Sequence, residues 1–229
     1  MQKYAAVVLA GGRGRRLGGP QKPAVAVSGR PMLGRVLAAV AGAAVRVVVG
    51  PPELGRLVPN GVSLMLEDPP GGGPVAALAA GLTAVPADVD RLVLLAADLP
   101  LLSPPAVDRL LGAVDGFDGA VYVDGAVYVD ADGRRQWLCG AWRVAALRDR
   151  LAGLAGPAAG RPPGDLAGRP PGDLAGRPPG DLAGRSLRDL FGPLRVADVS
   201  GPAGEPPPWY DCDTPAEVAE AERLQGGSA

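Results

Sequence analysis

The feature of this chain that most constrains its fold is an alternation of short apolar runs with helix-like segments. Apolar runs of this length favour buried strands, and the segments between them favour helical crossovers. The expected strands are Ala5–Leu9, Val45–Val49, Ser63–Leu66 and Leu92–Ala96, and the expected helices are Met32–Ala41, Val75–Ala84, Ala106–Val114 and Trp142–Leu154. This order predicts an α/β fold, a single-domain Rossmann-like three-layer α/β/α sandwich with a mostly parallel sheet.

Composition agrees with one domain over residues 1–229. With 229 residues and 47% hydrophobic content, the chain can bury one substantial core. Its net charge of −1 gives no overall attraction to nucleic acid or to a membrane surface. Cys139 and Cys212 lie far apart, which favours free thiols over a zinc site or a disulfide. The chain has neither a secretory signal pattern nor a membrane-length apolar run, so we expect a cytoplasmic protein, a monomer or weak oligomer.

The sequence contains no histidine, and this restricts the chemistry. Imidazole bases, Ser-His-Asp triads and histidine-bound metals are excluded. Catalysis must then rest on carboxylates, lysine or arginine, and a hard metal ion. Phosphoryl and nucleotidyl transfers suit such a set because they depend mainly on alignment and charge neutralisation.

The first expected strand opens into a cationic, glycine-rich segment, Ala10–Pro23. Glycines let backbone N–H groups approach a phosphate, and the arginines and Lys22 supply positive charge. Two familiar phosphate loops fail on spacing. A P-loop needs Lys and Ser/Thr after its last glycine, where this chain has Pro20 and Gln21, and a dinucleotide fingerprint needs a third glycine where it has Leu17. The segment predicts a nucleotide site of another kind.

A second candidate is Asp98, which ends the apolar run Arg91–Ala97. A carboxylate at the carboxyl end of a buried strand can hold Mg²⁺, which takes one or two protein oxygens together with substrate phosphates. The alternative is an aspartate that caps a turn. Because the chain also contains the glycine-rich segment, we favour a role for Asp98 as a metal ligand.

Two further segments are ambiguous alone. Leu66–Leu78 combines Glu67-Asp68 with a glycine loop that leads into a helix, and taken alone it is more typical of an ordinary turn. Near the end of the chain, Thr214 and Pro215 predict a helix start, with Thr214 as N-cap. Asp213 beside it is either a site carboxylate or a charge at a helix N-terminus.

Taken together, these segments resemble the molybdenum cofactor guanylyltransferases, a family of the nucleotide-diphospho-sugar-transferase-like superfamily. The signature L-A-G-G-x-x-x-R-[ML]-G-G-x-x-K is complete from Leu9 to Lys22. The other segments are similar to E-D-x-x-x-G-P-[LV]-A-G-[LI] and [ND]-x-[ND]-T-P-E-[DE]-[LV]. The resemblance implies an Mg²⁺-dependent transfer of GMP from GTP to the phosphate of molybdopterin (molybdenum cofactor), with release of pyrophosphate.

The resemblance also implies roles for particular residues. Lys22, Arg16 and Asp98 would be catalytic, and Asp98 and Asp213 would bind the metal. The nucleotide would contact Leu9, Ala10, Gly11, Gly12, Lys22, Asp68, Gly73 and Asp98. Cofactor-biosynthesis enzymes or acceptor enzymes would be partners.

The chain departs from the family pattern at three positions, with Gln21 where Asp is frequent, Gly50 where Asn is frequent, and Ala77 where Gly is usual. These departures leave the base open. The alternatives are a cytidylyltransferase or another small-molecule nucleotidyltransferase of the same fold, and a nucleotide-binding regulatory protein without turnover.

Three other segments give weaker expectations. Gln136–Arg143 holds two tryptophans and could contact a pterin, although such aromatics more often pack in a core. The hexapeptide at 118–123 recurs at 124–129, and Asp124-Gly125 could form a hairpin turn between the copies. An octamer rich in proline and glycine occurs three times from Gly160 to Ala183, which predicts a flexible loop over 156–185.

Overall fold

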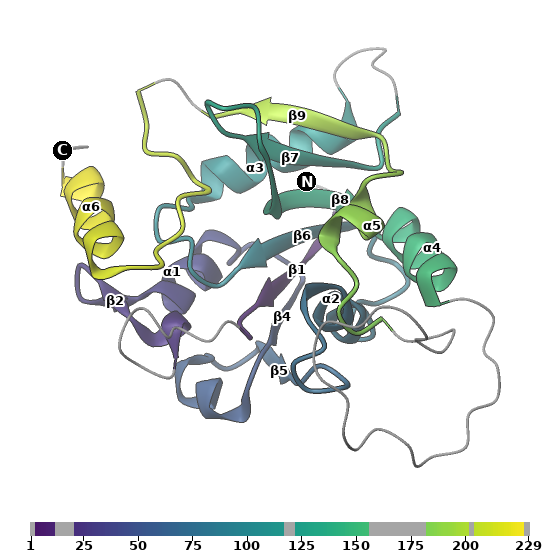
Figure 1. Ribbon diagram of the computed structural model, residues 1–229, viewed down its shortest axis with the longest axis horizontal. Helices are drawn as coiled ribbons and strands as arrows, with labels where there is room; N and C mark the ends of the chain where they lie inside the picture. Colours follow the sequence, from purple (N-terminus) through teal and green to yellow (C-terminus); the bar gives the residue numbers. More distant parts are fainter. Residues whose placement is uncertain (1–2, 12–20, 117–121, 156–181, 202–203, 227–229) are drawn as a thin grey trace.

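The computed structural model describes residues 3–11, 21–116, 122–155, 182–201 and 204–226. Seven strands form one sheet in the order β5-β4-β1-β6-β8-β7-β9 (Figure 1). The strands are β1 (Tyr4–Leu9), β4 (Val45–Val49), β5 (Ser63–Met65), β6 (Arg91–Ala96), β7 (Gly125–Val129), β8 (Arg135–Arg143) and β9 (Val196–Ser200). Strand β8 runs antiparallel to both neighbours, and the remaining pairs are parallel, which confirms the mostly parallel sheet.

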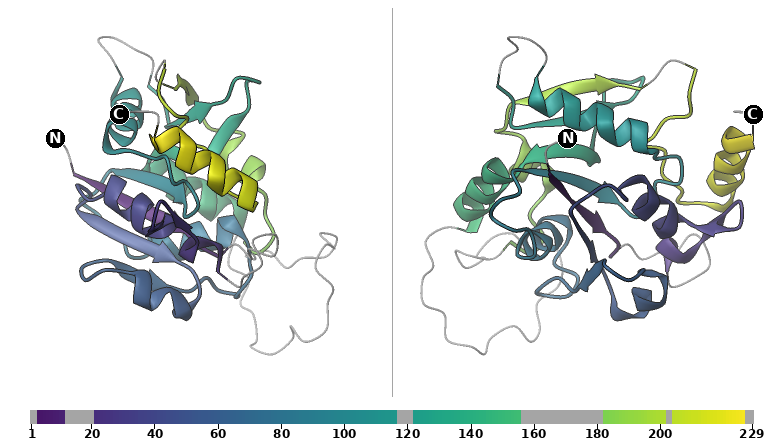
Figure 2. Two further views of the ribbon diagram at one scale, coloured as in Figure 1. Left: turned by 90° about the vertical axis from the view of Figure 1, so that its left-hand side faces the viewer. Right: turned by 180° about the vertical axis from the view of Figure 1, so that it is seen from behind.

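Helices cover both faces of this sheet (Figure 2). The helices are α1 (Met32–Ala39), α2 (Pro74–Leu82), α3 (Pro104–Asp115), α4 (Val144–Ala155), α5 (Leu187–Phe191) and α6 (Pro215–Gly226). Apolar residues of α1 and α3 pack on one face, and those of α2, α4 and α5 pack on the other. Each face therefore has its own apolar core, as expected for a three-layer α/β/α sandwich.

The predicted elements occur within a few residues of their expected bounds. Ser103 caps α3 as predicted, with its hydroxyl oxygen accepting a hydrogen bond from the Ala106 N–H. The predicted helix over Trp142–Leu154 begins later, at Val144, because Trp142 and Arg143 complete strand β8. Both cysteines are buried free thiols, as expected, and burial raises the pKa of Cys212 to about 12.

The predicted hairpin turn at Asp124-Gly125 is wrong. Gly125 begins β7, which pairs with β8 on one side and β9 on the other. The Asp124 N–H donates to the carbonyl of Arg195, and its own carbonyl accepts from the N–H of Arg143. The second hexapeptide copy is thus a central strand. Of the first copy, residues 118–121 lie outside the described residues and 122–123 are not a strand.

The predicted repeat loop falls mostly outside the described residues, which resume at Leu182. Its last residues are packed: Ala183 is buried, and the Gly184 N–H donates to the Gly72 carbonyl at 2.6 Å. The end of the third octamer therefore lies against the glycine loop that precedes α2.

A small accessory unit lies beside the carboxyl ends of β1 and β6. It consists of η2 (Lys22–Ala24), β2 (Ala26–Val27) and β3 (Arg30–Pro31), and α6 packs on it through a separate apolar cluster. The Glu222 carboxylate accepts a hydrogen bond from Ser28 N–H, and the Gln225 amide donates to the carbonyl of Pro100. These bonds fix the C-terminal segment next to the loop after β6. In the described ranges, no helix has the length and apolarity to cross a membrane.

Replacement of Gly125 by Ala should destabilise the fold. A methyl group there would lie 2.2 Å from a ring carbon of Trp142, which is fully buried and stacks on Phe191 at a centroid distance of 4.0 Å. We expect Gly125→Ala to lower the free energy of unfolding, measured in urea, by about 3 kcal/mol. The matched control is Gly112→Ala in α3, where an added methyl contacts nothing within 4 Å and should raise stability by up to about 1 kcal/mol. Equal stability of Gly125→Ala and the unaltered protein would contradict this packing.

Candidate active site

Parallel pairing of β1 with β6 places the first part of the site. Leu9 and Ala96 are register partners at the carboxyl ends of these strands, and the Ala97 N–H donates to the Leu9 carbonyl at 3.0 Å. The chain leaves β1 through Ala10 and Gly11, and it leaves β6 through Ala97 and Asp98. The backbone that begins the glycine-rich segment and the predicted metal carboxylate thus emerge side by side.

Lys22 is the central cation of the site. Its side chain is 10% exposed, and the ammonium forms ion pairs with Asp98 and Asp213. Burial alone would lower the pKa of Lys22, but hydrogen bonds and charge from Asp213 and Asp98 outweigh it, so the pKa lies above its usual value. Lys22 therefore remains charged throughout the physiological pH range.

Asp213 reaches Lys22 because the C-terminal segment folds back over the accessory unit. Thr214 caps α6 as predicted: its hydroxyl accepts from the Glu217 N–H, and the Glu217 carboxylate accepts from the N–H groups of Thr214 and Asp213. This reciprocal cap fixes the backbone at Asp213. Lys22 and Asp213, which are 191 positions apart in sequence, thus meet at one ion pair.

A third carboxylate, Asp211, joins this group. Oxygens of Asp98, Asp211 and Asp213 lie within 4.8 Å of one another. Burial raises the pKa of Asp211, and the neighbouring charges of Asp98 and Asp213 add to the rise. The Oδ1 atom of Asp98 is buried and has no hydrogen-bond partner among the residues that the structure describes. Clustered carboxylates with an unpaired buried oxygen fit a hard divalent cation, which prefers oxygen ligands.

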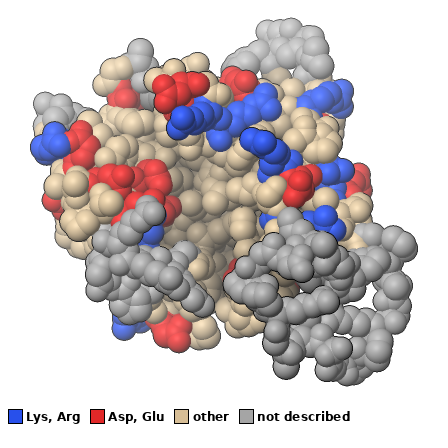
Figure 3. Space-filling model, viewed as in Figure 1, with Lys and Arg blue, Asp and Glu red and all other residues tan. Residues whose placement is uncertain are grey.

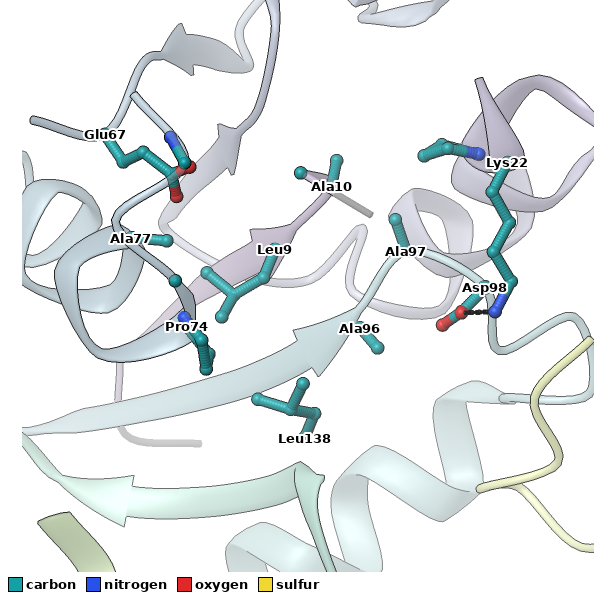
Figure 4. A pocket seen from close by; sticks show the side chains of 14 residues that line it. Leu9, Ala10, Lys22, Glu67, Pro74, Ala77, Ala96, Ala97, Asp98 and Leu138 are labelled. Carbon is teal, nitrogen blue, oxygen red and sulfur yellow. Dashed lines mark hydrogen bonds and ion pairs between the residues drawn. The ribbon is translucent and has the colours of Figure 1, made fainter. Parts of the chain in front are cut away.

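A cavity of about 480 Å³ opens between these residues and the loop after β5 (Figure 4). Such a volume suits a nucleotide-sized ligand. The cavity has an apolar floor formed partly by Leu9 and Leu138, with Lys22 and Asp98 at one end and Glu67 at the other. Figure 3 shows the hollow in this face of the molecule, walled mostly by uncharged residues and with acidic side chains gathered to its left.

A second cavity of about 320 Å³ adjoins the first. The two share Ala96, Asp98 and Leu138 in their linings. Trp137, Trp209 and Arg135 line the second cavity, and the Arg135 guanidinium lies 5.6 Å from the centre of the Trp137 ring. Asp98 thus lines both the larger cavity and the second cavity, whose lining includes aromatic and cationic side chains. Two bound molecules could meet at this carboxylate.

The structure places most of the predicted site residues together. Lys22 forms ion pairs with Asp98 and Asp213, and Leu9, Ala10, Gly11 and Gly73 line the larger cavity with Lys22 and Asp98. Asp68 does not line it: its side chain is exposed, and Glu67 takes that place. Arg16 and Gly12 lie outside the described residues.

The sequence motifs assigned no role to Glu67, Asp211 or Trp209. Glu67 and Asp68 are adjacent acids in a loop. Because a loop has no regular alternation of buried and exposed positions, the sequence does not tell which of the two side chains points into the cavity. The two tryptophans of Gln136–Arg143, the expected pterin contact, have different surroundings. Trp137 lines the second cavity, whereas Trp142 lies in the core. The Arg143 guanidinium donates to the carbonyls of Val114 and Val123, away from the site.

An α/β sandwich in which Lys22 and carboxylates meet beside a nucleotide-sized cavity, near the carboxyl ends of β1 and β6, is typical of nucleotidyltransferases. Residues 6–162 match the MobA-like NTP transferase domain, and the chain belongs to this family.

Two curated proteins are similar to this chain in sequence. The chain is 28% identical over 225 residues to a molybdenum cofactor guanylyltransferase from Bradyrhizobium sp. (strain ORS 278), covering 95% of this chain and 91% of the relative. It is 33% identical over 152 residues to a molybdenum cofactor guanylyltransferase from Rhodobacter capsulatus, covering 63% of this chain and 71% of the relative.

Solved structures share the fold at lower identity. Molybdopterin-guanine dinucleotide biosynthesis protein A from Archaeoglobus fulgidus superposes with a TM-score of 0.65 at 19% identity, covering 97% of this chain and 99% of that one. A nucleotidyl transferase from Methanothermobacter thermautotroptrophicus gives a TM-score of 0.65 at 21% identity over 100% of both chains. These likenesses support the single-domain α/β fold.

Proposed function

We propose that this protein transfers GMP from GTP to the phosphate of molybdopterin in the cytoplasm, releasing pyrophosphate and forming a guanine dinucleotide cofactor. The observation that carries the proposal is Asp98, a carboxylate shared by two adjoining cavities. A transferase that joins two substrates needs both reacting groups at one point. The two guanylyltransferase relatives support this choice of substrates over a cytidylyltransferase or a binding protein without turnover.

In this proposal GTP occupies the larger cavity. Leu9, Ala10 and Gly11 border it at the end of β1, and Gly73 borders it before α2. The phosphates would lie toward Lys22, whose ammonium neutralises their charge, and the base would lie toward Glu67. Gly12 and Arg16 lie outside the described residues, and their proposed roles rest on the signature that runs from Leu9 to Lys22.

Molybdopterin would occupy the second cavity. The flat rings of Trp137 and Trp209 suit a planar heterocycle, and Arg135 suits the charge of its phosphate. Trp209 also packs on Tyr128 at a centroid distance of 5.2 Å, which holds the indole in place. The acceptor phosphate would then approach Asp98 from the side opposite to the nucleotide.

The reaction joins an oxygen of the acceptor phosphate to the α-phosphorus of GTP and breaks the bond from that phosphorus to the bridging oxygen of pyrophosphate. The attacking phosphate is already ionised at neutral pH, so no side chain needs to remove a proton. This agrees with a sequence that lacks histidine. Lys22 would hold the triphosphate and reduce the charge repulsion between the two phosphates.

Asp98 and Asp213 would hold Mg²⁺, with Asp211 beside them. When bound, Mg²⁺ would supply charge neutralisation on phosphate oxygens and on the leaving pyrophosphate. In the nucleotide-free protein Lys22 forms ion pairs with both Asp98 and Asp213, and its single positive charge offsets one of their two negative charges. The Lys22 ammonium and Mg²⁺ would therefore bind the same carboxylates. When GTP is bound, its phosphates would offer the ammonium other anionic partners.

Replacement of Asp98 by Asn tests the proposal. The amide keeps the shape but removes the charge, so we expect pyrophosphate release from GTP with molybdopterin to fall at least about a hundredfold, while the fold is retained. The control is Asp88→Asn, which breaks only the exposed ion pair with Lys3. Full turnover of Asp98→Asn, or no release by the unaltered protein with GTP, would contradict the proposal.

Replacement of Lys22 by Met should strengthen metal binding by the nucleotide-free protein. Without the ammonium, Asp98 and Asp213 become an unneutralised pair of carboxylates. We expect Mn²⁺, measured by electron paramagnetic resonance, to bind at least about tenfold more tightly than in the unaltered protein. Lys3→Met makes the same change at an exposed ion pair and should leave Mn²⁺ affinity unchanged. Equal or weaker binding by Lys22→Met would show that the cation is held elsewhere.

A further inference from the structure

We propose that the carboxylate of Glu67 selects guanine by accepting hydrogen bonds from its N1–H and its 2-amino group. The inference rests on the proposed function, because it requires a guanine nucleotide in the larger cavity. It assigns base selection to a residue next to Asp68, the acid that sequence resemblance pointed to.

The position of Glu67 agrees with base recognition. Glu67 follows β5 and Asp98 follows β6, and strands β4 and β1 lie between these two strands in the sheet. Figure 4 shows Glu67 across the cavity from Lys22 and Asp98, with Leu9 and Ala10 between them. A nucleotide with its phosphates at Lys22 extends its base toward Glu67.

The carboxylate is held in a defined orientation. Its Oε1 atom accepts a hydrogen bond from the Gly71 N–H at 2.7 Å. A Cβ added at Gly11 would lie 3.8 Å from Oε1 and 3.9 Å from Oε2, so both oxygens face the backbone at the end of β1. Gly11 has no side chain there, which leaves the space in front of the two oxygens to a ligand.

The carboxylate has unused acceptor capacity. Among the residues that the structure describes, no lysine or arginine pairs with Glu67. One bond from Gly71 leaves most of its lone pairs free. A half-buried carboxylate without a cation is stabilised when a ligand brings hydrogen-bond donors to it.

Guanine is the common base that offers two adjacent donors, N1–H and the 2-amino group, to two carboxylate oxygens. Cytosine and adenine present a donor next to a ring nitrogen that is an acceptor, and this acceptor would face a carboxylate oxygen. Uracil presents one donor between two carbonyl oxygens. Glu67 therefore favours guanine and also repels the alternatives, which is how specific sites discriminate.

The test compares nucleotide binding by the unaltered protein and by Glu67→Gln, measured by isothermal titration calorimetry with GTP, ITP, 1-methyl-GTP and CTP. ITP lacks the 2-amino group, and 1-methyl-GTP lacks the N1 proton. We expect each to bind the unaltered protein at least about tenfold more weakly than GTP, the loss of one hydrogen bond to a charged group.

In Glu67→Gln, the amide oxygen can keep the bond from Gly71, and the amide nitrogen becomes a donor facing the base. This donor opposes guanine but matches the acceptor nitrogen of cytosine. We expect GTP to bind at least about tenfold more weakly, the difference between GTP and ITP to disappear, and the ratio of CTP to GTP affinity to rise at least about tenfold. Glu53→Gln makes the same change at an exposed site outside the cavity and should alter none of these values.

The outcomes separate the inference from the proposed function. If Glu67→Gln keeps the GTP affinity and the preference for GTP over ITP, Glu67 does not select the base. If Asp68→Asn abolishes that preference instead, the neighbouring acid does. If the unaltered protein shows no preference for GTP over CTP, the proposed function itself fails. The ITP and 1-methyl-GTP measurements need no variant, and equal affinity for them and GTP overturns the inference even if Glu67→Gln does not fold.

Discussion

The ion pairs of Lys22 with Asp98 and Asp213 are the interaction on which the site depends. Their members come from a short helix after the glycine-rich segment, from the loop after β6, and from the C-terminal segment before α6. The parallel pairing of β1 with β6 positions Asp98, and the packing of α6 on the accessory unit positions Asp213. The fold therefore brings these charged side chains together near the carboxyl ends of β1 and β6. Their partial burial there strengthens the electrostatic interaction between them.

This arrangement explains why a chain without histidine is suited to its chemistry. Transfer between two phosphates needs neutralised charge and alignment more than it needs a proton acceptor. Lys22 supplies a permanent cation, since its pKa lies above the usual value. The carboxylates pair with that cation before substrates arrive, so the buried ammonium has anionic partners. In the proposed reaction, the two cavities that share Asp98 would hold the GMP donor and the acceptor separately.

Much of this organisation could be predicted from the sequence, because the deciding signals are local. A strand with a carboxylate at its end, such as β6 with Asp98, and a capped helix start, such as Ser103-Pro104, depend on neighbouring residues. The errors arose where long-range packing decides. Gly125 is a strand residue because β7 pairs with β8 and β9, and Trp142 leaves it no room for a side chain. The sequence near Gly125 indicates neither contact. The inward direction of Glu67 and the meeting of Asp211 with Asp98 likewise depend on how distant loops are placed.

The most direct test of the shared-carboxylate account is a crystal structure with Mg²⁺ and a non-hydrolysable GTP analogue. We predict the triphosphate in the larger cavity, with the α-phosphate beside Asp98, the ammonium of Lys22 on phosphate oxygens, and the guanine edge on Glu67. The second cavity, with Trp137 and Trp209, should stay open for the acceptor. A nucleotide bound in the second cavity, or one whose phosphates lie away from Lys22 and Asp98, would contradict the account.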